Sequence, residues 1–83
     1  MKHKYSYVYI LQGEKDSRRH YTGLTDDLAD RFKKHNRGEV PHTAKYRPWR
    51  LRVAIAFDDR NRAAAFEDYL KTHSGRVFAS RHF

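Results

Sequence analysis

The chain has 83 residues, no cysteine, and 18 Lys and Arg against 10 Asp and Glu, which gives a formal net charge of +8. This length predicts one domain, residues 1–83, with one modest core, and the lack of cysteine excludes disulfides and thiolate metal sites. No apolar run is long enough to cross a membrane, and no secretory segment follows the basic N-terminus. We therefore expect a cytoplasmic protein without a membrane partner that binds a polyanion, and nucleic acid is the class favoured by the charge.

Two short strands are expected first. In residues 5–12, Tyr5, Tyr7 and Tyr9 alternate with smaller residues, a period typical of a pleated strand. Residues 13–19 are polar, begin with glycine and predict a loop. Residues 20–24 predict a second strand, so the two form an antiparallel hairpin with a long basic tip.

A helix is expected after the hairpin. Thr25 or Asp26 is the predicted cap, and acids follow in the first turn, where they complement the helix dipole. Leu28 and Phe32 lie four residues apart and form the buried stripe. Gly38 is the predicted stop.

A loop and a third strand follow. Residues 39–48 contain two prolines and predict a loop that interleaves cations with an aromatic ring. Residues 49–58 have the longest alternating pattern in the chain, which places Trp49, Leu51 and Val53 on one face of a strand and makes Trp49 a core residue.

A second helix begins after the aspartates at 58–59 and carries Phe66 and Leu70 on its buried side. Gly75 is expected to end or bend this helix, and the predicted core ends at residue 74. Residues 75–83 form a tail that is a candidate for a short third helix, to which Val77 and Phe78 offer only a small apolar face. The expected fold is α+β, with a small three-stranded antiparallel sheet flanked by helices in the order strand, strand, helix, strand, helix.

Several side chains suit phosphodiester chemistry. Arg31 and His35 lie four apart at the edge of the buried stripe, and Glu67 is suited to hold one Mg²⁺ through water and substrate phosphate. Tyr9 and Tyr21 offer phenols that hydrogen-bond water and whose pKa a nearby cation lowers. Taken singly, each also fits an ordinary role, as a solvated helix flank, a surface ion pair or a sheet tyrosine.

Further residues are candidates for substrate contact. Gly23 removes a side chain beside Tyr21 and so allows a backbone or a phosphate to approach closely. Two basic segments are expected to grip the substrate, because cations neutralise phosphates and an aromatic ring stacks on an exposed base. The residues of these segments are Arg18, Arg19, Lys45, Tyr46 and Arg47.

Together these residues match one family in order and spacing. Residues 5–70 resemble the GIY-YIG nuclease superfamily of homing endonucleases, excision-repair nucleases and structure-specific resolvases, in particular its small stand-alone bacterial members. The segments 7–9 and 21–23 are similar to its two motifs. Arg31 resembles the family's catalytic arginine, and Glu67 falls where the family places its metal-binding glutamate.

The resemblance implies a structure-selective endonuclease that hydrolyses phosphodiester bonds in DNA with a single Mg²⁺ or Mn²⁺ ion. In that case Tyr9 acts as general base on the attacking water, and Tyr21 orients the water or the phosphate. Arg31 stabilises the charge that develops on the phosphate, and Glu67 holds the metal. His35 is a second candidate for proton transfer or phosphate contact.

The chain departs from the family after the second helix, where many members carry Asn and residues 72–76 contain none. One alternative is therefore a catalytically weak or inactive nucleic-acid-binding module, and another is an interaction protein that docks on a ribonucleoprotein. The expected partner is DNA in preference to RNA, and a partner protein supplies targeting if the domain does not itself recognise unusual structure. No structural zinc site is expected, because the histidines show no ligand spacing. They are His3, His20, His35, His42, His73 and His82.

Overall fold

The computed structural model describes residues 4–83, so His3 lies outside the described residues. The elements are β1 (Ser6–Gly13), β2 (His20–Thr25), α1 (Leu28–Arg37), α2 (Pro41–Ala44), β3 (Trp49–Phe57), α3 (Arg60–Leu70) and α4 (His73–His82). This order confirms the predicted α+β class, and α4 is the short helix expected near the C-terminal end. No helix within residues 4–83 combines the length and the apolar character that crossing a bilayer requires.

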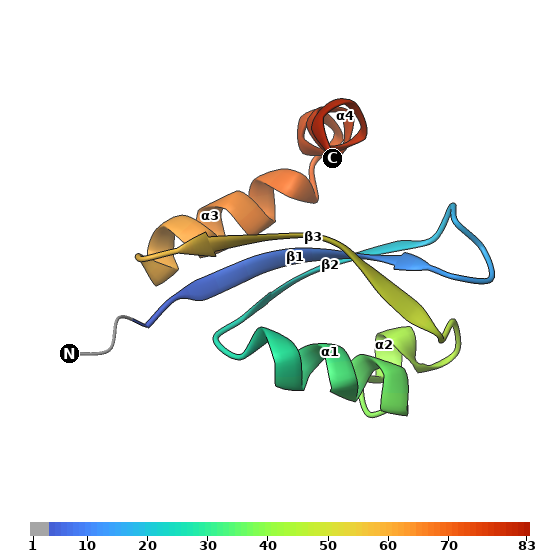
Figure 1. The fold of residues 1–83 in the computed structure, drawn as a ribbon. Coiled ribbons are helices and arrows are strands. Elements are labelled where there is room, and N and C mark those ends of the chain that lie inside the picture. Colours follow the sequence, from blue (N-terminus) through green and yellow to red (C-terminus); the bar gives the residue numbers. More distant parts are fainter. Residues whose placement is uncertain (1–3) are drawn as a thin grey trace.

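The sheet has the order β2-β1-β3, and both pairings are antiparallel, as predicted. Helices α1 and α2 lie on one face, and α3 lies on the other with α4 beyond its end (Figure 1). The central strand β1 therefore supplies side chains to two cores. Tyr9 and Leu11 pack with Trp49 on the α1 side, and Val8 and Ile10 pack against α3.

Strand β3 changes face at a β-bulge. The register with β1 shifts by one residue beside Arg52, so the alternation of side chains is interrupted there. As a result Trp49 packs on the α1 side, Val53 packs on the α3 side, and Leu51 is 38% exposed. Trp49 is confirmed as a core residue with 3% exposure. The prediction that the three residues share one face was wrong, because it assumed an uninterrupted strand.

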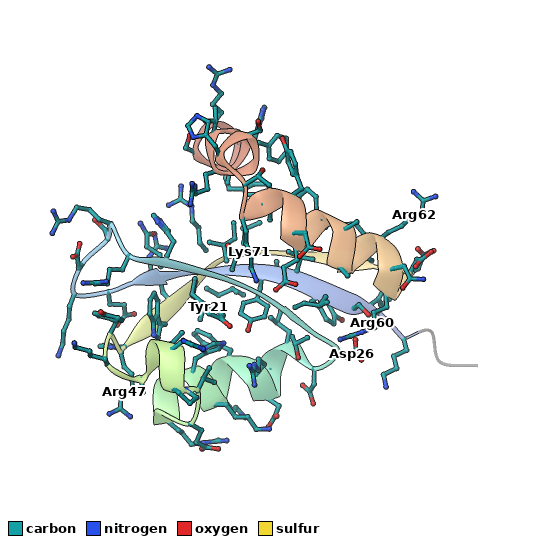
Figure 2. All side chains as sticks on the ribbon, turned by 180° about the vertical axis from the view of Figure 1, so that it is seen from behind. Tyr21, Asp26, Arg47, Arg60, Arg62 and Lys71 are labelled. Carbon is teal, nitrogen blue, oxygen red and sulfur yellow. The ribbon has the colours of Figure 1, made fainter. Side chains whose placement is uncertain are left out.

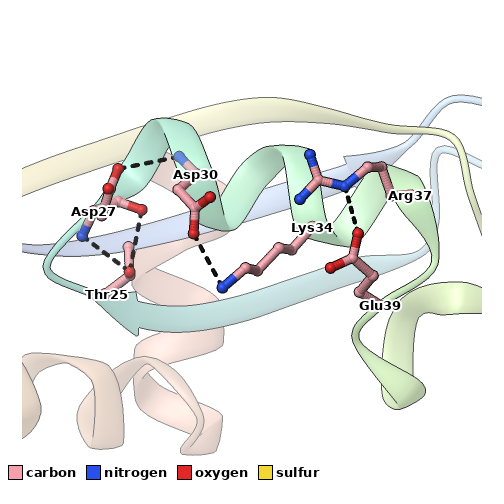
Figure 3. Close-up of polar contacts among 6 residues, drawn as sticks. All are labelled: Thr25, Asp27, Asp30, Lys34, Arg37 and Glu39. Atoms are coloured by element: carbon pink, nitrogen blue, oxygen red, sulfur yellow. Dashed lines mark hydrogen bonds and ion pairs between the residues drawn. The ribbon is translucent and has the colours of Figure 1, made fainter.

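Helix α1 begins one or two residues later than the predicted caps. Asp27 is the N-cap, and its side chain accepts a hydrogen bond from the Asp30 backbone N–H at 3.1 Å (Figure 3). Thr25 supports this turn, because its hydroxyl accepts from the Asp27 N–H at 3.1 Å. Asp26 is used elsewhere: it accepts from the Ser6 hydroxyl at 2.8 Å and pairs with Arg60 at 2.6 Å, which ties β1 and both helical layers together (Figure 2).

Helix α1 ends at Gly38, as predicted, through a left-handed cap with φ of 80°. The segment after it was predicted to be a loop but contains α2. This short helix begins with Pro41 in its first turn, where a missing N–H costs nothing. Thr43 on α2 is buried, and its carbonyl oxygen accepts from the Trp49 indole N–H at 2.9 Å.

Helix α4 follows α3 after a sharp turn. Thr72 is its N-cap and accepts from the Gly75 N–H at 3.1 Å, so Gly75 lies in the first turn of α4 and does not end α3. A Cβ atom on Gly75 would lie only 1.8 Å from the Tyr69 carbonyl oxygen, so the two helices meet there backbone to backbone. Phe78 then packs edge-on against Phe66, with ring centroids 6.3 Å apart.

This contact predicts that Gly75→Ala lowers the free energy of unfolding by about 1–3 kcal/mol, because the added methyl group forces α4 away from α3. Helix propensity alone predicts the opposite sign, since alanine is the better helix former. Urea unfolding measures the effect, and Ser74→Ala, at an exposed position of the same turn, is the control. A Gly75→Ala protein as stable as the wild type would contradict this packing.

Candidate active site

A chain of buried polar groups joins β1, α1 and α2. The Tyr9 hydroxyl lies 2.8 Å from His35 Nε2, and His35 Nδ1 lies 2.7 Å from Thr43 Oγ1. All three side chains are buried, and His35 has no exposed surface (0%). The sequence placed Tyr9 and His35 in one site, and the structure brings them into direct contact.

The direction of these hydrogen bonds follows from Thr43. Its hydroxyl donates to the Val40 carbonyl oxygen at 3.3 Å, so it accepts from His35 Nδ1–H. We infer that His35 Nε2 is then the acceptor and that the Tyr9 hydroxyl donates to it. Burial, reinforced by the Arg31 charge, lowers the pKa of His35 to about 4, so the ring is neutral at pH 7.

Arg31 precedes His35 by one turn on α1, and its guanidinium lies beside the Tyr9 hydroxyl. Burial raises the pKa of Tyr9 above its usual value, and the hydrogen bond from Arg31 opposes that rise. The same hydrogen bond raises the pKa of the Arg31 guanidinium. The Tyr21 ring completes the group, with its centroid 5.0 Å from that of His35 and 6.3 Å from that of Tyr9. Tyr9 is thus a protonated phenol held between an acceptor and a cation.

Gly23 allows the Tyr9 ring to occupy this position. Gly23 on β2 is the direct partner of Tyr9 on β1, and a Cβ atom on Gly23 would lie 2.4 Å from the Tyr9 hydroxyl oxygen. The sequence suggested that this glycine admits a backbone or a phosphate. In the structure the group that approaches it is the Tyr9 phenol.

Glu67 comes from α3, on the other side of the sheet, and only 17% of its side chain is exposed. Its charge contributes to the raised pKa of Tyr9, which links it electrostatically to the site. It pairs with Lys71 at 3.2 Å. Among residues 4–83, no three His, Asp or Glu side chains lie close enough to hold a metal by themselves. A single carboxylate still fits Mg²⁺, which keeps several waters and takes other ligands from substrate phosphate.

The structure brings some of the predicted substrate contacts to this site. Arg19 lies over the Tyr46 ring at 3.6 Å, and Lys45 approaches the same ring at 5.8 Å. Arg18 and Arg19, Tyr46 and Tyr21 line one pocket of about 290 Å³. Arg18 also pairs with the partly exposed Asp16 at 3.0 Å, and its hydrogen bond lowers the pKa of that carboxyl.

Arg47 is the predicted contact that lies apart from the others. It does not line the pocket, and it projects away from Tyr21 beyond α2 (Figure 2). Its guanidinium covers Gly38 at the end of α1, where a Cβ atom would lie 2.0 Å from Nη1. Arg47 is therefore placed to cover the helix end.

Two residues that support the site were missed by the sequence analysis. Thr43 orients His35, and Asn36 joins α1 to the start of β3 by accepting from the Trp49 N–H at 2.7 Å and donating to its carbonyl oxygen at 2.9 Å. Only the position of Asn36, directly after His35, was a usable signal. Thr43 lies outside α1, so no helical spacing relates it to His35. The two side chains meet only because α2 packs against α1.

Comparison with known proteins supports the resemblance. Residues 5–80 match the family model described as the GIY-YIG catalytic domain, a span that reaches into α4. The UPF0213 protein HQ_3675A of Haloquadratum walsbyi is 36% identical over 74 residues, which cover 84% of this chain and 78% of that protein. No solved structure gave a significant match.

The Gly23 contact predicts that Gly23→Ala displaces the Tyr9 phenol from His35 and lowers the free energy of unfolding by about 1–3 kcal/mol. Thr22→Ala, at the neighbouring position of β2, is the matched control. The ring nitrogen signals of His35, recorded by NMR, report the loss of the Tyr9 hydrogen bond directly. Unchanged His35 signals in Gly23→Ala would show that the phenol does not depend on this glycine.

The low pKa of His35 predicts a pH dependence of stability. Between pH 6.5 and about 4 the unfolded state binds the proton and the native state does not, so stability is full above this window and falls as the pH decreases through it. The loss is about 1.4 kcal/mol per pH unit at most. Urea unfolding across the window measures it, and His35→Gln, which lacks the titrating ring, should give a flatter profile. Equal slopes for the two proteins would contradict a neutral, buried His35.

Proposed function

Because the chain belongs to the GIY-YIG catalytic domain family, we propose that it is a nuclease that hydrolyses phosphodiester bonds in DNA with one Mg²⁺ or Mn²⁺ ion. The observation that carries this proposal is the placement of Tyr9 between His35 and Arg31. A buried phenol with a base on one side and a guanidinium on the other is arranged for proton transfer beside an anion.

Tyr9 acts as general base by accepting one proton while it gives up its own. Its raised pKa means that it is not ionised before the reaction, so it accepts a proton from the attacking water only as its own proton moves to His35 Nε2. The charge of Arg31 opposes protonation of His35 in the free protein. A bound phosphate offsets that charge and so makes His35 a better acceptor at the moment when it is needed.

Arg31 and Glu67 act on the phosphate from two sides. The Arg31 guanidinium stabilises negative charge on the phosphate oxygens as the transition state forms. Glu67 is the residue that would hold the divalent ion, whose contribution when bound is to stabilise the leaving oxygen. Lys71 neutralises Glu67 in the protein alone, at 3.2 Å, and is free to contact a phosphate when Glu67 binds metal. Tyr21, the remaining aromatic side chain, orients the water or the phosphate.

The substrate is selected by its structure in preference to its sequence. Arg18, Arg19 and Tyr46 line one pocket with Tyr21, and Lys45 approaches the Tyr46 ring. These side chains are suited to phosphates and to an unpaired base, contacts that carry little sequence information. A partner protein supplies further targeting if the domain does not find unusual structures by itself.

The test is a nuclease assay on plasmid, single strands, flaps and junctions with Mg²⁺ or Mn²⁺. Glu67→Gln should lose cleavage by at least about 100-fold, as does removal of one preorganised charge-stabilising group, while it still folds and binds DNA. Asp68→Asn, which changes the neighbouring exposed carboxylate in the same way, should keep wild-type activity. Chelation of the metal should abolish cleavage by every active protein.

A second candidate function is favoured by the composition of residues 72–76. They contain no Asn, and Thr72 and Gly75 are used to begin α4. This favours a nucleic-acid-binding module with weak or no cleavage. Strong, salt-sensitive binding without any metal-dependent product would establish that function and reject the nuclease. Cleavage that Glu67→Gln fails to reduce would instead show that the metal is held by other residues.

A further inference from the structure

A larger cavity, of about 530 Å³, lies on the side of the sheet opposite α1, between the three strands and α4. Its apolar floor is formed by Ile10, Leu70 and Ala79. Basic side chains surround this floor, and its lining includes no carboxylate from residues 4–83. They are His20, Arg52, Lys71 and Arg76.

These cations differ in how much of their charge is already paired. Lys71 pairs with Glu67, and Arg52 donates a hydrogen bond to the backbone oxygen of Phe83. Within residues 4–83, the Arg76 guanidinium has neither a hydrogen bond nor an ion pair, although Arg76 lines the cavity. Burial lowers the pKa of His20, and the charge of the nearby Arg52 adds to this effect. An anion is therefore the ligand that these walls favour.

Two residues connect the cavity to the candidate active site. Tyr21 lines this cavity and also the pocket that contains Arg19 and Tyr46. Lys71 lines the cavity and donates a hydrogen bond to Glu67, which lies one turn earlier in the chain. Because Lys71 contacts Glu67 and also lines the cavity, a DNA strand bound at Glu67 passes beside the cavity.

We propose that this cavity binds one unpaired nucleotide of the DNA strand, directly beside the phosphate that is cleaved. The proposal rests on the nuclease function proposed above. The face of the base lies on the aliphatic floor, and its phosphate lies against Arg76. The volume is in the range of small-ligand pockets, which combine an apolar lining with a few placed polar groups.

This occupant defines the substrate class. The cavity is walled by the sheet on one side and by α4 on the other, so a base enters it only when it is out of the duplex stack. The preferred substrates are then single strands, flaps and overhangs with an unpaired nucleotide next to the cleavage site. Fully paired duplex lacks this contact and depends on the basic segments around Tyr46.

The experiment is a binding titration in EDTA, where nothing is cleaved. The probe is a fluorescein-labelled single strand of thymidine nucleotides, with blunt duplex DNA beside it. Arg76→Gln should weaken single-strand binding by about 5- to 10-fold and reduce its salt slope by about 0.7, the value for one phosphate contact on a single strand. Arg81→Gln removes the same charge from an exposed position of α4 outside the cavity and should change binding by less than about 2-fold.

A second pair of variants tests the space without changing charge. Ser80 is exposed and lines the cavity, so Ser80→Leu narrows it and should weaken binding of the single strand but not of the blunt duplex. Ser74→Leu, exposed on the same helix and outside the cavity, is its control. Competition by inorganic phosphate as strong as that by thymidine monophosphate would overturn the assignment of the base to the floor.

The outcomes separate this inference from the proposed function. Single-strand binding that Arg76→Gln and Ser80→Leu both weaken supports the cavity as a nucleotide site, even if no substrate is cleaved. Metal-dependent cleavage together with wild-type binding by both variants would leave the nuclease intact and overturn the cavity. Equal weakening by Arg76→Gln and Arg81→Gln would also overturn it, since the effect would then be one of net charge.

Discussion

The rest of the structure depends on the complete burial of the His35 imidazole. A ring without exposed surface needs protein partners for both nitrogens, and these are Tyr9 on β1 and Thr43 on α2. One residue thereby fixes α1 between the central strand and the short helix that follows it. Asn36 and Trp49 close the same unit, because they hold the start of β3 against α1 and α2. Loss of one partner leaves a buried polar group unsatisfied, at a cost of about 1–3 kcal/mol.

The same arrangement determines which chemistry is available. The 83 residues include no cysteine and so offer no thiolate, and among residues 4–83 no cluster of His, Asp and Glu could hold a metal by itself. Tyr9 is the centre of these groups because it lies on the one strand that is paired on both sides. Gly23 clears the space for its phenol, Arg31 places a cation beside it, and the charge of Glu67 in the other layer contributes to its raised pKa. In the proposed reaction, the fixed position of these groups replaces the ionisation of any single residue.

Local patterns predicted much of the fold and of the site. Alternating residues identified the strands, and spacings of four placed Arg31 beside His35, because both signals depend only on neighbours in the chain. The bulge beside Arg52 was not predictable in this way, since it exists only in relation to β1. Thr43 was missed because its role depends on the return of α2 to α1. The segment after residue 74 was predicted to lie outside the core, because Val77 and Phe78 form only a small apolar face by themselves. Phe78 finds its partners, such as Phe66, on α3.

The bulge in β3 also affects how two molecules of this protein can contact each other. Strand β3 is an edge of the sheet, and a long, flat, open edge invites pairing with a strand of another molecule. Here the edge is twisted at Arg52 and carries a second cation, Arg50, two residues before it. Local twist and charge of one sign both discourage a second strand from adding to the sheet. The irregularity that divides the side chains of β3 between two cores therefore also protects a small, highly charged domain against self-association and aggregation through its outer strand.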